Sequence, residues 1–256
     1  MPRGHVDPGL SGVATALWVQ GEGRKAAEEL RRAGVRVLLL KGPDLQQRLY
    51  GTPAAYASGD VDVLIPPRSA ARARSALVRA GWVFSPDNGV LWRLSRAAAF
   101  DRESFRLDLH WGLHAAHLPA WSLRSLEDRL WRGARPGRSG MLEPDTESLL
   151  VFLAVHVVGH GFERSDWGEN VHRAAALVED WAEVWEIARE ARVQGAVHAA
   201  LEDRHGSDAP ILDGAWGRTV SLATWIGRGH FIPPAERDRM RRWVALVRER
   251  FVSRVL

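Results

Sequence analysis

The sequence predicts an α/β (α+β) protein: a small mixed sheet with helices, followed by an all-helical C-terminal domain. Strand and helix patterns alternate along the first 118 residues, whereas strand patterns almost vanish after residue 118 and helical periodicity takes over. The length of 256 residues is enough for two moderate domains. We therefore expect one domain over 1–118 and a helical domain over 119–256.

Turn and cap residues divide the first domain into its elements. Gly34 ends the first helix, Pro43 takes the first position of the next, and Gly81 stops the third. A Pro-Asp-Asn-Gly turn separates two short strands that follow the third helix. The expected order is a helix over 12–33, a strand over 35–40, a short helix within 41–51 that begins at Pro43, a strand within 58–67, a helix over 68–82, two strands within 82–95 and a strand over 104–113.

The second domain shows helical patterns almost throughout. A strand signal remains only near Gly140–Leu142. The expected helices cover 145–160, 169–192, 194–205, 209–227 and 234–255.

The composition excludes several classes of function. Hydrophobic residues make up 46% of the chain and charged residues 26%, as in ordinary globular proteins. Cysteine is absent, which excludes disulfides, thiolate metal sites and thiol nucleophiles. No apolar run of 18 residues and no signal-peptide pattern occurs, so we expect no membrane span and a cytoplasmic location. The net charge of +4 suits a phosphate-bearing ligand but is weak support for nucleic-acid binding.

Two aspartates stand inside an apolar strand, in the segment "SGDVDVLIPP". Side chains alternate along a strand, so Asp60 and Asp62 point to the same side, about 7 Å apart along the chain. Buried carboxylates without partners are costly, because both are desolvated and repel each other. If the strand is buried, these carboxylates therefore need a partner of opposite charge.

A third aspartate lies on a later strand, "FRLDLHW". Alternation puts Arg106, Asp108 and His110 on one side of this strand and apolar residues on the other. If the two strands are neighbours, three carboxylates meet on one face of the sheet. Oxygen ligands of this kind suit Mg²⁺, and two such ions can clamp a displacement at phosphorus.

A phosphate-binding turn precedes these strands. Lys41 and Gly42 end one strand, and the helix that begins with Pro43 follows at once. A helix N-terminus attracts phosphate, Gly42 permits close approach of the backbone, and Lys41 adds a charge. Lysine occurs only at positions 25 and 41, so Lys41 is unusual in this Arg-rich chain.

Simpler interpretations of these residues stay open. Asp60 and Asp62 could be solvated at a sheet edge or paired with arginine, and Asp108 could pair with Arg106 or Arg102. His110 could be a structural histidine. His156 and His160 have the spacing of a zinc helix, but Val157 replaces the glutamate that metalloproteases place after the first histidine, so a zinc site is not favoured.

The order of these motifs resembles the polymerase-β-like nucleotidyltransferase superfamily, and more closely a family of uncharacterised bacterial nucleotidyltransferases. The matching pieces are Leu40-Lys41-Gly42, Tyr50-Gly51, Asp60-Val61-Asp62 and Asp108-Leu109-His110-Trp111. The resemblance implies that 1–118 is the catalytic domain and that 119–256 forms the acceptor side. It also implies transfer of a nucleoside monophosphate from an NTP to a hydroxyl of a small-molecule or peptide acceptor, with two Mg²⁺ ions.

The resemblance also implies roles for individual residues. Asp60 and Asp62 would bind both metals, and Asp108 the metal that activates the acceptor. The nucleotide would be bound by Lys41, Gly42, Ser58 and His110. Relatives often carry an arginine where this chain has Tyr56. Two alternatives therefore stay open: a binding module that retains the carboxylates, or a repurposed site that transfers another group, such as a sugar.

Overall fold

The structure is a computed structural model that describes residues 12–85, 96–113, 120–159 and 165–202. By its internal contacts the chain splits into two compact units. The first comprises Met1–His114 and Glu127–Leu149, and the second comprises Ala115–Leu126 and Leu150–Leu256. Each unit is described by itself below. The boundary at residue 118 stays a prediction.

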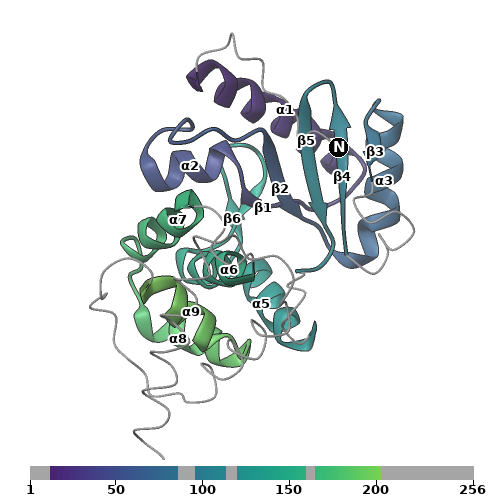
Figure 1. Cartoon of the computed structure of the whole chain (residues 1–256). Coiled ribbons are helices and arrows are strands. Elements are labelled where there is room, and N and C mark those ends of the chain that lie inside the picture. The colour runs from purple at the N-terminus through teal and green to yellow at the C-terminus, as the bar shows by residue number, and fades with distance from the viewer. Residues whose placement is uncertain (1–11, 86–95, 114–119, 160–164, 203–256) are drawn as a thin grey trace, which may run out of the picture. The chain divides into compact units, whose positions relative to one another are not determined.

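A mixed sheet forms the centre of the first unit, as the sequence predicts (Figure 1). Within the described residues the strand order is β3-β4-β5-β2-β1-β7-β6. The pairs β2–β5 and β1–β7 are parallel, and the other neighbours are antiparallel. The strands are β1 (Leu38–Lys41), β2 (Asp60–Leu64), β3 (Val83–Ser85), β4 (Ala97–Arg102), β5 (Phe105–His110), β6 (Arg135–Pro136) and β7 (Leu142–Glu143).

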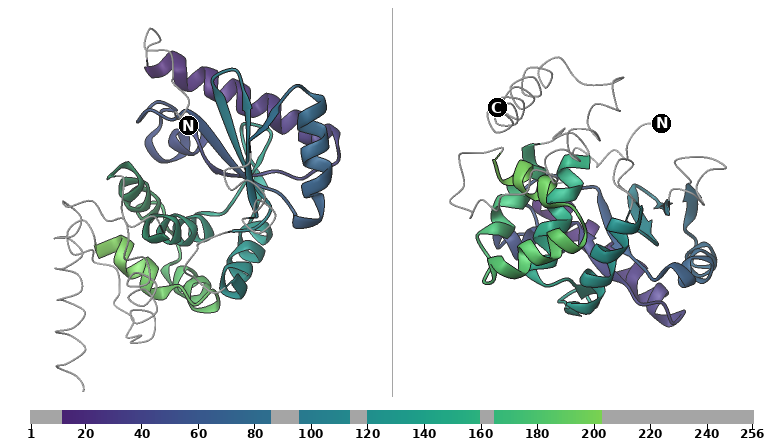
Figure 2. Two further views of the ribbon diagram at one scale, coloured as in Figure 1. Left: turned by 45° about the vertical axis from the view of Figure 1, so that its right-hand side comes forward. Right: turned by 90° about the horizontal axis from the view of Figure 1, so that it is seen from below.

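One face of this sheet is covered by α1 (Gly12–Arg32) and α3 (Ala70–Arg79), which pack against each other (Figure 2). The odd-numbered residues of β2 and β5, Val61 and Leu107 among them, are buried in the core beneath these helices. The even-numbered residues of both strands therefore lie on the opposite face. A short helix, α2 (Pro43–Tyr50), follows β1 directly.

An ion-pair cluster ties α1 to β4 on the helix-covered side. Arg102 Nε donates to Glu22 Oε2 at 3.2 Å, and Lys25 Nζ lies 2.7 Å from Glu22 Oε1. The Arg102 guanidinium also lies over the Trp82 ring, 4.3 Å from its centroid. Arg102 is thus engaged by Glu22. Of the two arginines considered as partners of Asp108, the structure pairs Arg106 with it.

Several expected elements of the first unit differ from the structure. β1 begins at Leu38, three residues later than predicted. The helix expected over 68–82 is a 3₁₀ turn (Pro67–Ser69) followed by α3. β4 was not predicted, because its segment "AAAFDR" is rich in alanine, which disfavours strands in isolation. Pairing with both β3 and β5 overrides that preference. The second strand expected within 82–95 lies outside the described residues.

The helices that follow are α5 (Ala120–Arg132), α6 (Thr146–Gly159), α7 (Ser165–Ala175), α8 (Trp181–Glu190) and α9 (Gln194–Glu202). Residues 148–155 of α6 are all buried, as expected of a helix that is apolar all round. In the second unit α9 packs against α7 and α8. None of the helices in the described part of the chain is both long and apolar enough to span a membrane.

The prediction of one helix over 169–192 is wrong. The structure has two helices, with a break between Ala175 and Trp181. Asp180 begins α8, because its carboxylate accepts a hydrogen bond from Glu183 N at 3.1 Å. α5, whose buried Leu123, Leu126 and Leu130 follow helical spacing, was not predicted. The helices expected over 209–227 and 234–255 lie outside the described residues.

Candidate active site

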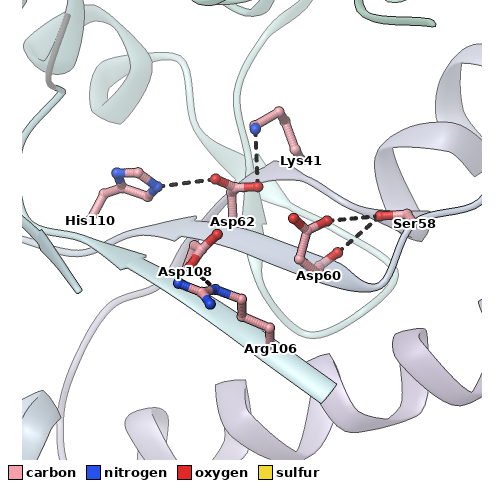
Figure 3. Close-up of polar contacts among 7 residues, drawn as sticks. All are labelled: Lys41, Ser58, Asp60, Asp62, Arg106, Asp108 and His110. Atoms are coloured by element: carbon pink, nitrogen blue, oxygen red, sulfur yellow. Dashed lines mark hydrogen bonds and ion pairs between the residues drawn. The ribbon is translucent and has the colours of Figure 1, made fainter. Parts of the chain in front are cut away.

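Three aspartates converge on the sheet face opposite α1. β2 and β5 are parallel neighbours, and their register places Asp62 beside Asp108 and Asp60 beside Arg106. A ligand oxygen from each of Asp60, Asp62 and Asp108 lies within 4.8 Å of the others. Figure 3 shows the three side chains on one side of the two strands. The predicted convergence of the carboxylates is therefore confirmed.

Asp62 lies between two basic groups (Figure 3). Its Oδ2 is 3.1 Å from Lys41 Nζ, and its Oδ1 is 3.1 Å from His110 Nε2. Only 8% of the Asp62 side chain is exposed, so both contacts act in partly dry surroundings. Lys41 and His110 thus lie within the candidate site, where the sequence places them.

A β-bulge explains how Lys41 reaches Asp62. Leu39 pairs with Val63, but the register shifts after Leu39, so that Lys41 and not Leu40 stands opposite Asp62. Residues that stand opposite each other in an antiparallel pair present their side chains on the same face. A bulge re-aims a side chain in this way, and here it places the Lys41 ammonium among the carboxylates.

Asp60 begins β2 and contacts Ser58 (Figure 3). The Ser58 hydroxyl lies 3.1 Å from both the main-chain oxygen and Oδ1 of Asp60. Tyr56 N donates to Gln46 Oε1 at 3.1 Å, which anchors this segment to α2. Ser58 therefore helps to orient the first carboxylate of the group.

Asp108 has an unusual protonation equilibrium. Its pKa is raised from 3.8 to about 6, chiefly by burial and further by repulsion from Asp62 and Asp60, whereas His110 and Arg106 act to lower it. Arg106 Nε lies 3.1 Å from Asp108 Oδ1. One guanidinium contact therefore does not fully offset burial beside two other carboxylates.

Gly42 brings the turn between β1 and α2 close to β2. Its φ of 126° and ψ of −172° are accessible essentially to glycine alone. A Cβ at this position would stand 3.1 Å from Val61 Cγ2 and 3.4 Å from the main-chain oxygen of Asp60. Pro43 follows at the first helical position. Gly42 thus allows the N-terminus of α2 to lie directly beside the strand that carries the aspartates.

The acidic residue in the first turn of α2 does not cap its own helix. No side chain caps α2, and the buried Asp44 accepts a hydrogen bond from Gln20 Nε2 on α1 at 2.7 Å. Arg24 lies farther away, 3.7 Å from the same carboxylate. Asp44 therefore holds α2 against α1.

The donor set fits a hard divalent cation. Three carboxylates with close oxygens are the ligand type that Mg²⁺ binds, and the remaining positions are commonly filled by water or substrate phosphate. In the described part of the chain this is the group of acidic and histidine residues that could hold a metal ion. Asp60, Asp62 and Asp108 would hold it.

Arg106 was not predicted as a functional residue. From the sequence it is considered only as an ion-pair partner of Asp108, in the interpretation without a functional site. The sequence carries the signal that it shares the polar face, because it stands two residues before Asp108 on an alternating strand. The structure pairs it in register with Asp60 as well as in contact with Asp108.

Comparison with known families identifies the chain. Residues 13–210 match the family described as uncharacterised nucleotidyltransferase. The chain belongs to this family. The match spans β1, α2, β2 and β5, and so includes every residue of the candidate site. The sequence-based resemblance to a nucleotidyltransferase family is confirmed.

Other comparisons give only distant likenesses. No curated protein matches the chain. Among solved structures, the antibiotic-resistance factor ANT(2'')-Ia is 12% identical with a TM-score of 0.46, over 75% of this chain and 98% of the other. A tRNA-processing enzyme in an apo form is 14% identical with a TM-score of 0.30, over 74% of this chain and 60% of the other. At these values neither likeness bears on the function of this chain.

Proposed function

We propose that this nucleotidyltransferase moves a nucleoside monophosphate from an NTP to a hydroxyl of a small-molecule or peptide acceptor and releases pyrophosphate. The observation that carries the proposal is the meeting of three carboxylate side chains within 4.8 Å, with Lys41 at the same place. Family membership supports the class of reaction. A cytoplasmic location stays a prediction, and nucleic acid is the less favoured acceptor.

Each side chain of the site has a proposed role. Asp60, Asp62 and Asp108 would hold Mg²⁺, and Asp108 would bind the ion that activates the acceptor. Lys41 and Gly42 bind the triphosphate, since an ammonium and a helix N-terminus both favour phosphate oxygens. Ser58 orients Asp60, and both Ser58 and His110 border the nucleotide. Bound Mg²⁺ would supply charge neutralisation of the phosphates and a lower pKa for the acceptor hydroxyl.

The chain's own residues contribute mostly by positioning. The parallel register of β2 and β5 fixes the three carboxylates before any ligand arrives. The bulge in β1 fixes Lys41 beside them. Preorganised charges of this kind stabilise a transition state without reorganisation at the moment of reaction.

A labelled-nucleotide experiment tests the proposal. Purified protein, Mg²⁺ and each NTP are incubated with an extract of small molecules and peptides, with the label at the α-phosphate or at the γ-phosphate. Nucleotidyl transfer moves the α-label to an acceptor and leaves the γ-label in pyrophosphate. Transfer of the γ-label would contradict the proposal, and product mass would identify transfer of a sugar. Asp60→Asn is the matched inactive control.

One observation favours a second candidate, a binding module without catalysis. Lys41 contacts Asp62 and Arg106 contacts Asp108, so basic side chains of the chain itself partly neutralise the carboxylates. Calorimetry with Mg²⁺ and each NTP separates the candidates. Nucleotide binding that does not depend on Mg²⁺ and survives Asp60→Asn would favour the binding module.

A further inference from the structure

Basic side chains of the candidate site form ion pairs with its carboxylates. Lys41 Nζ lies 3.1 Å from Asp62 Oδ2, and Arg106 Nε lies 3.1 Å from Asp108 Oδ1 (Figure 3). Each pair involves a carboxylate that a metal ion would also bind. A cation that binds these carboxylates must therefore compete with a cation already in the protein.

We infer that Arg106 is a second phosphate-binding side chain of the proposed nucleotidyl-transfer site, which neutralises Asp108 until metal takes that carboxylate and then contacts the nucleotide. The inference rests on the proposed function and assigns a residue that the family resemblance does not. Lys41 makes the same exchange at Asp62. The two basic groups thus pass from carboxylate to phosphate as the site fills.

The position of Arg106 suits this exchange. Its register partner is Asp60, so its backbone lies beside the first carboxylate while its guanidinium contacts the third. Its side chain is 31% exposed, which leaves it room to turn without unfolding the strand. A guanidinium can donate two parallel hydrogen bonds to one phosphate. Exchanging one carboxylate contact for a bidentate phosphate contact is therefore favourable for Arg106.

Charge balance gives the order of loading. Three carboxylates with Lys41 and Arg106 leave one net negative charge in the site when His110 is neutral. Two divalent cations without a nucleotide would make this partly buried site strongly positive, which is unfavourable at low dielectric. A triphosphate supplies the compensating negative charge and the new partners for both basic groups. Metal alone should therefore bind weakly, and metal and nucleotide should bind cooperatively.

The test measures metal and nucleotide binding separately, without turnover. Mn²⁺ alone is titrated at pH 8 and followed by electron paramagnetic resonance. The non-hydrolysable α,β-methylene analogues of ATP, GTP, CTP and UTP are then titrated by calorimetry with Mn²⁺ present. Arg106→Gln should bind Mn²⁺ alone roughly three- to tenfold more tightly than the wild type, because the competing cation is gone. It should bind the preferred analogue roughly tenfold more weakly.

Three further variants make the result specific. Arg106→Lys keeps the charge and should keep the Mn²⁺ affinity within about twofold of the wild type. Lys41→Met should change both affinities in the same directions as Arg106→Gln and carries the test of the exchange if Arg106→Gln does not fold. Arg102→Gln, which removes the guanidinium that holds Glu22 elsewhere in the same unit, should lower the melting temperature and change neither affinity.

Tighter binding of Mn²⁺ together with weaker binding of the nucleotide analogue by Arg106→Gln, relative to the wild type, would support the inference. If Arg106 has only a structural role, Arg106→Gln should bind Mn²⁺ more weakly or should change neither affinity. Either result would overturn the inference. Failure of the wild type to bind Mn²⁺ with any analogue would instead overturn the proposed function, and the inference with it.

Discussion

Two charged groups in the first unit are neutralised to different extents: Glu22 with its basic partners, and the three aspartates on the opposite face of the sheet. On the helix-covered side, Lys25 and Arg102 contact Glu22, and their hydrogen bonds outweigh burial and hold its pKa below the usual 4.5. On the opposite side, burial and the neighbouring carboxylates raise the pKa of Asp108 to about 6 despite Arg106. In the first group one carboxylate has two basic partners, so its negative charge is more than offset. The second retains excess negative charge, as a site for additional cations does.

The largest expected effect comes from removing one charge of the second group. Asp60→Asn should lower nucleotidyl transfer at least about a thousandfold, because several kcal/mol of charge stabilisation is lost with the metal. The rate is measured by transfer of the α-label. Glu22→Gln, assayed at a temperature where it stays folded, should retain most of the activity. Equal losses in both variants would remove the distinction between the groups.

The second prediction concerns stability, and here the larger effect is expected from the variant of Glu22. Glu22→Gln should lower the free energy of unfolding by about 2 kcal/mol, because the Arg102 charge keeps its partly buried position without a charged partner. Urea denaturation followed by tryptophan fluorescence measures it. Glu28, which pairs with Arg31 and Arg32 on the exposed side of α1, provides the control. Glu28→Gln should leave stability near that of the wild type.

The sequence predicts the carboxylates of the site better than it predicts their partners. Alternation alone places Asp60, Asp62 and Asp108 on one face, because strand geometry has a period of two residues. The contact between Lys41 and Asp62 depends on a one-residue shift in β1, and nothing in "VLLLKG" specifies where such a bulge falls.

The fold shows the same division between local patterns and tertiary context. Helices bounded by proline and glycine signals, such as α2 between Pro43 and Gly51, are predicted nearly to the residue. β4 is not, because an alanine-rich segment becomes a strand only when two neighbours pair with it. The break before Asp180 is not predicted either, because an aspartate can cap a new helix or stand on the polar side of a longer amphipathic one.

The third prediction uses pH to distinguish the two groups by sign. The pKa of Asp108 is higher in the folded chain, about 6 against 3.8, so the stability it contributes at acid pH is lost as pH rises from about 4 to about 6. The difference in unfolding free energy between wild type and Asp108→Asn should fall over this range, by an amount on the order of 2 kcal/mol.

Glu22 should show the opposite slope. Its pKa is lowered in the folded chain, so its contribution is present above pH 4.5 and is lost as pH falls through the folded value. The free energy of unfolding of the wild type minus that of Glu22→Gln should therefore rise with pH. Urea titrations at several pH values, without divalent cations, measure both differences. Slopes of the same sign would contradict the contrast between the groups.

The smallest effect is the most specific to the site. In Asp62→Asn the ion pair with Lys41 is lost, but so is repulsion by Asp60 and Asp108, and these changes oppose each other. The metal-free variant should therefore unfold within about 1 kcal/mol of the wild type, or above it, although Asp62 is as buried as Glu22. Mg²⁺ with a bound nucleotide should raise the melting temperature of the wild type through binding to the native state and do little for Asp62→Asn. Thermal unfolding of both proteins with and without these ligands checks the prediction in one experiment. If Asp62→Asn is less stable than the wild type, and Mg²⁺ with nucleotide shifts the melting temperature of neither protein, then Asp62 forms only a structural ion pair, as Glu22 does.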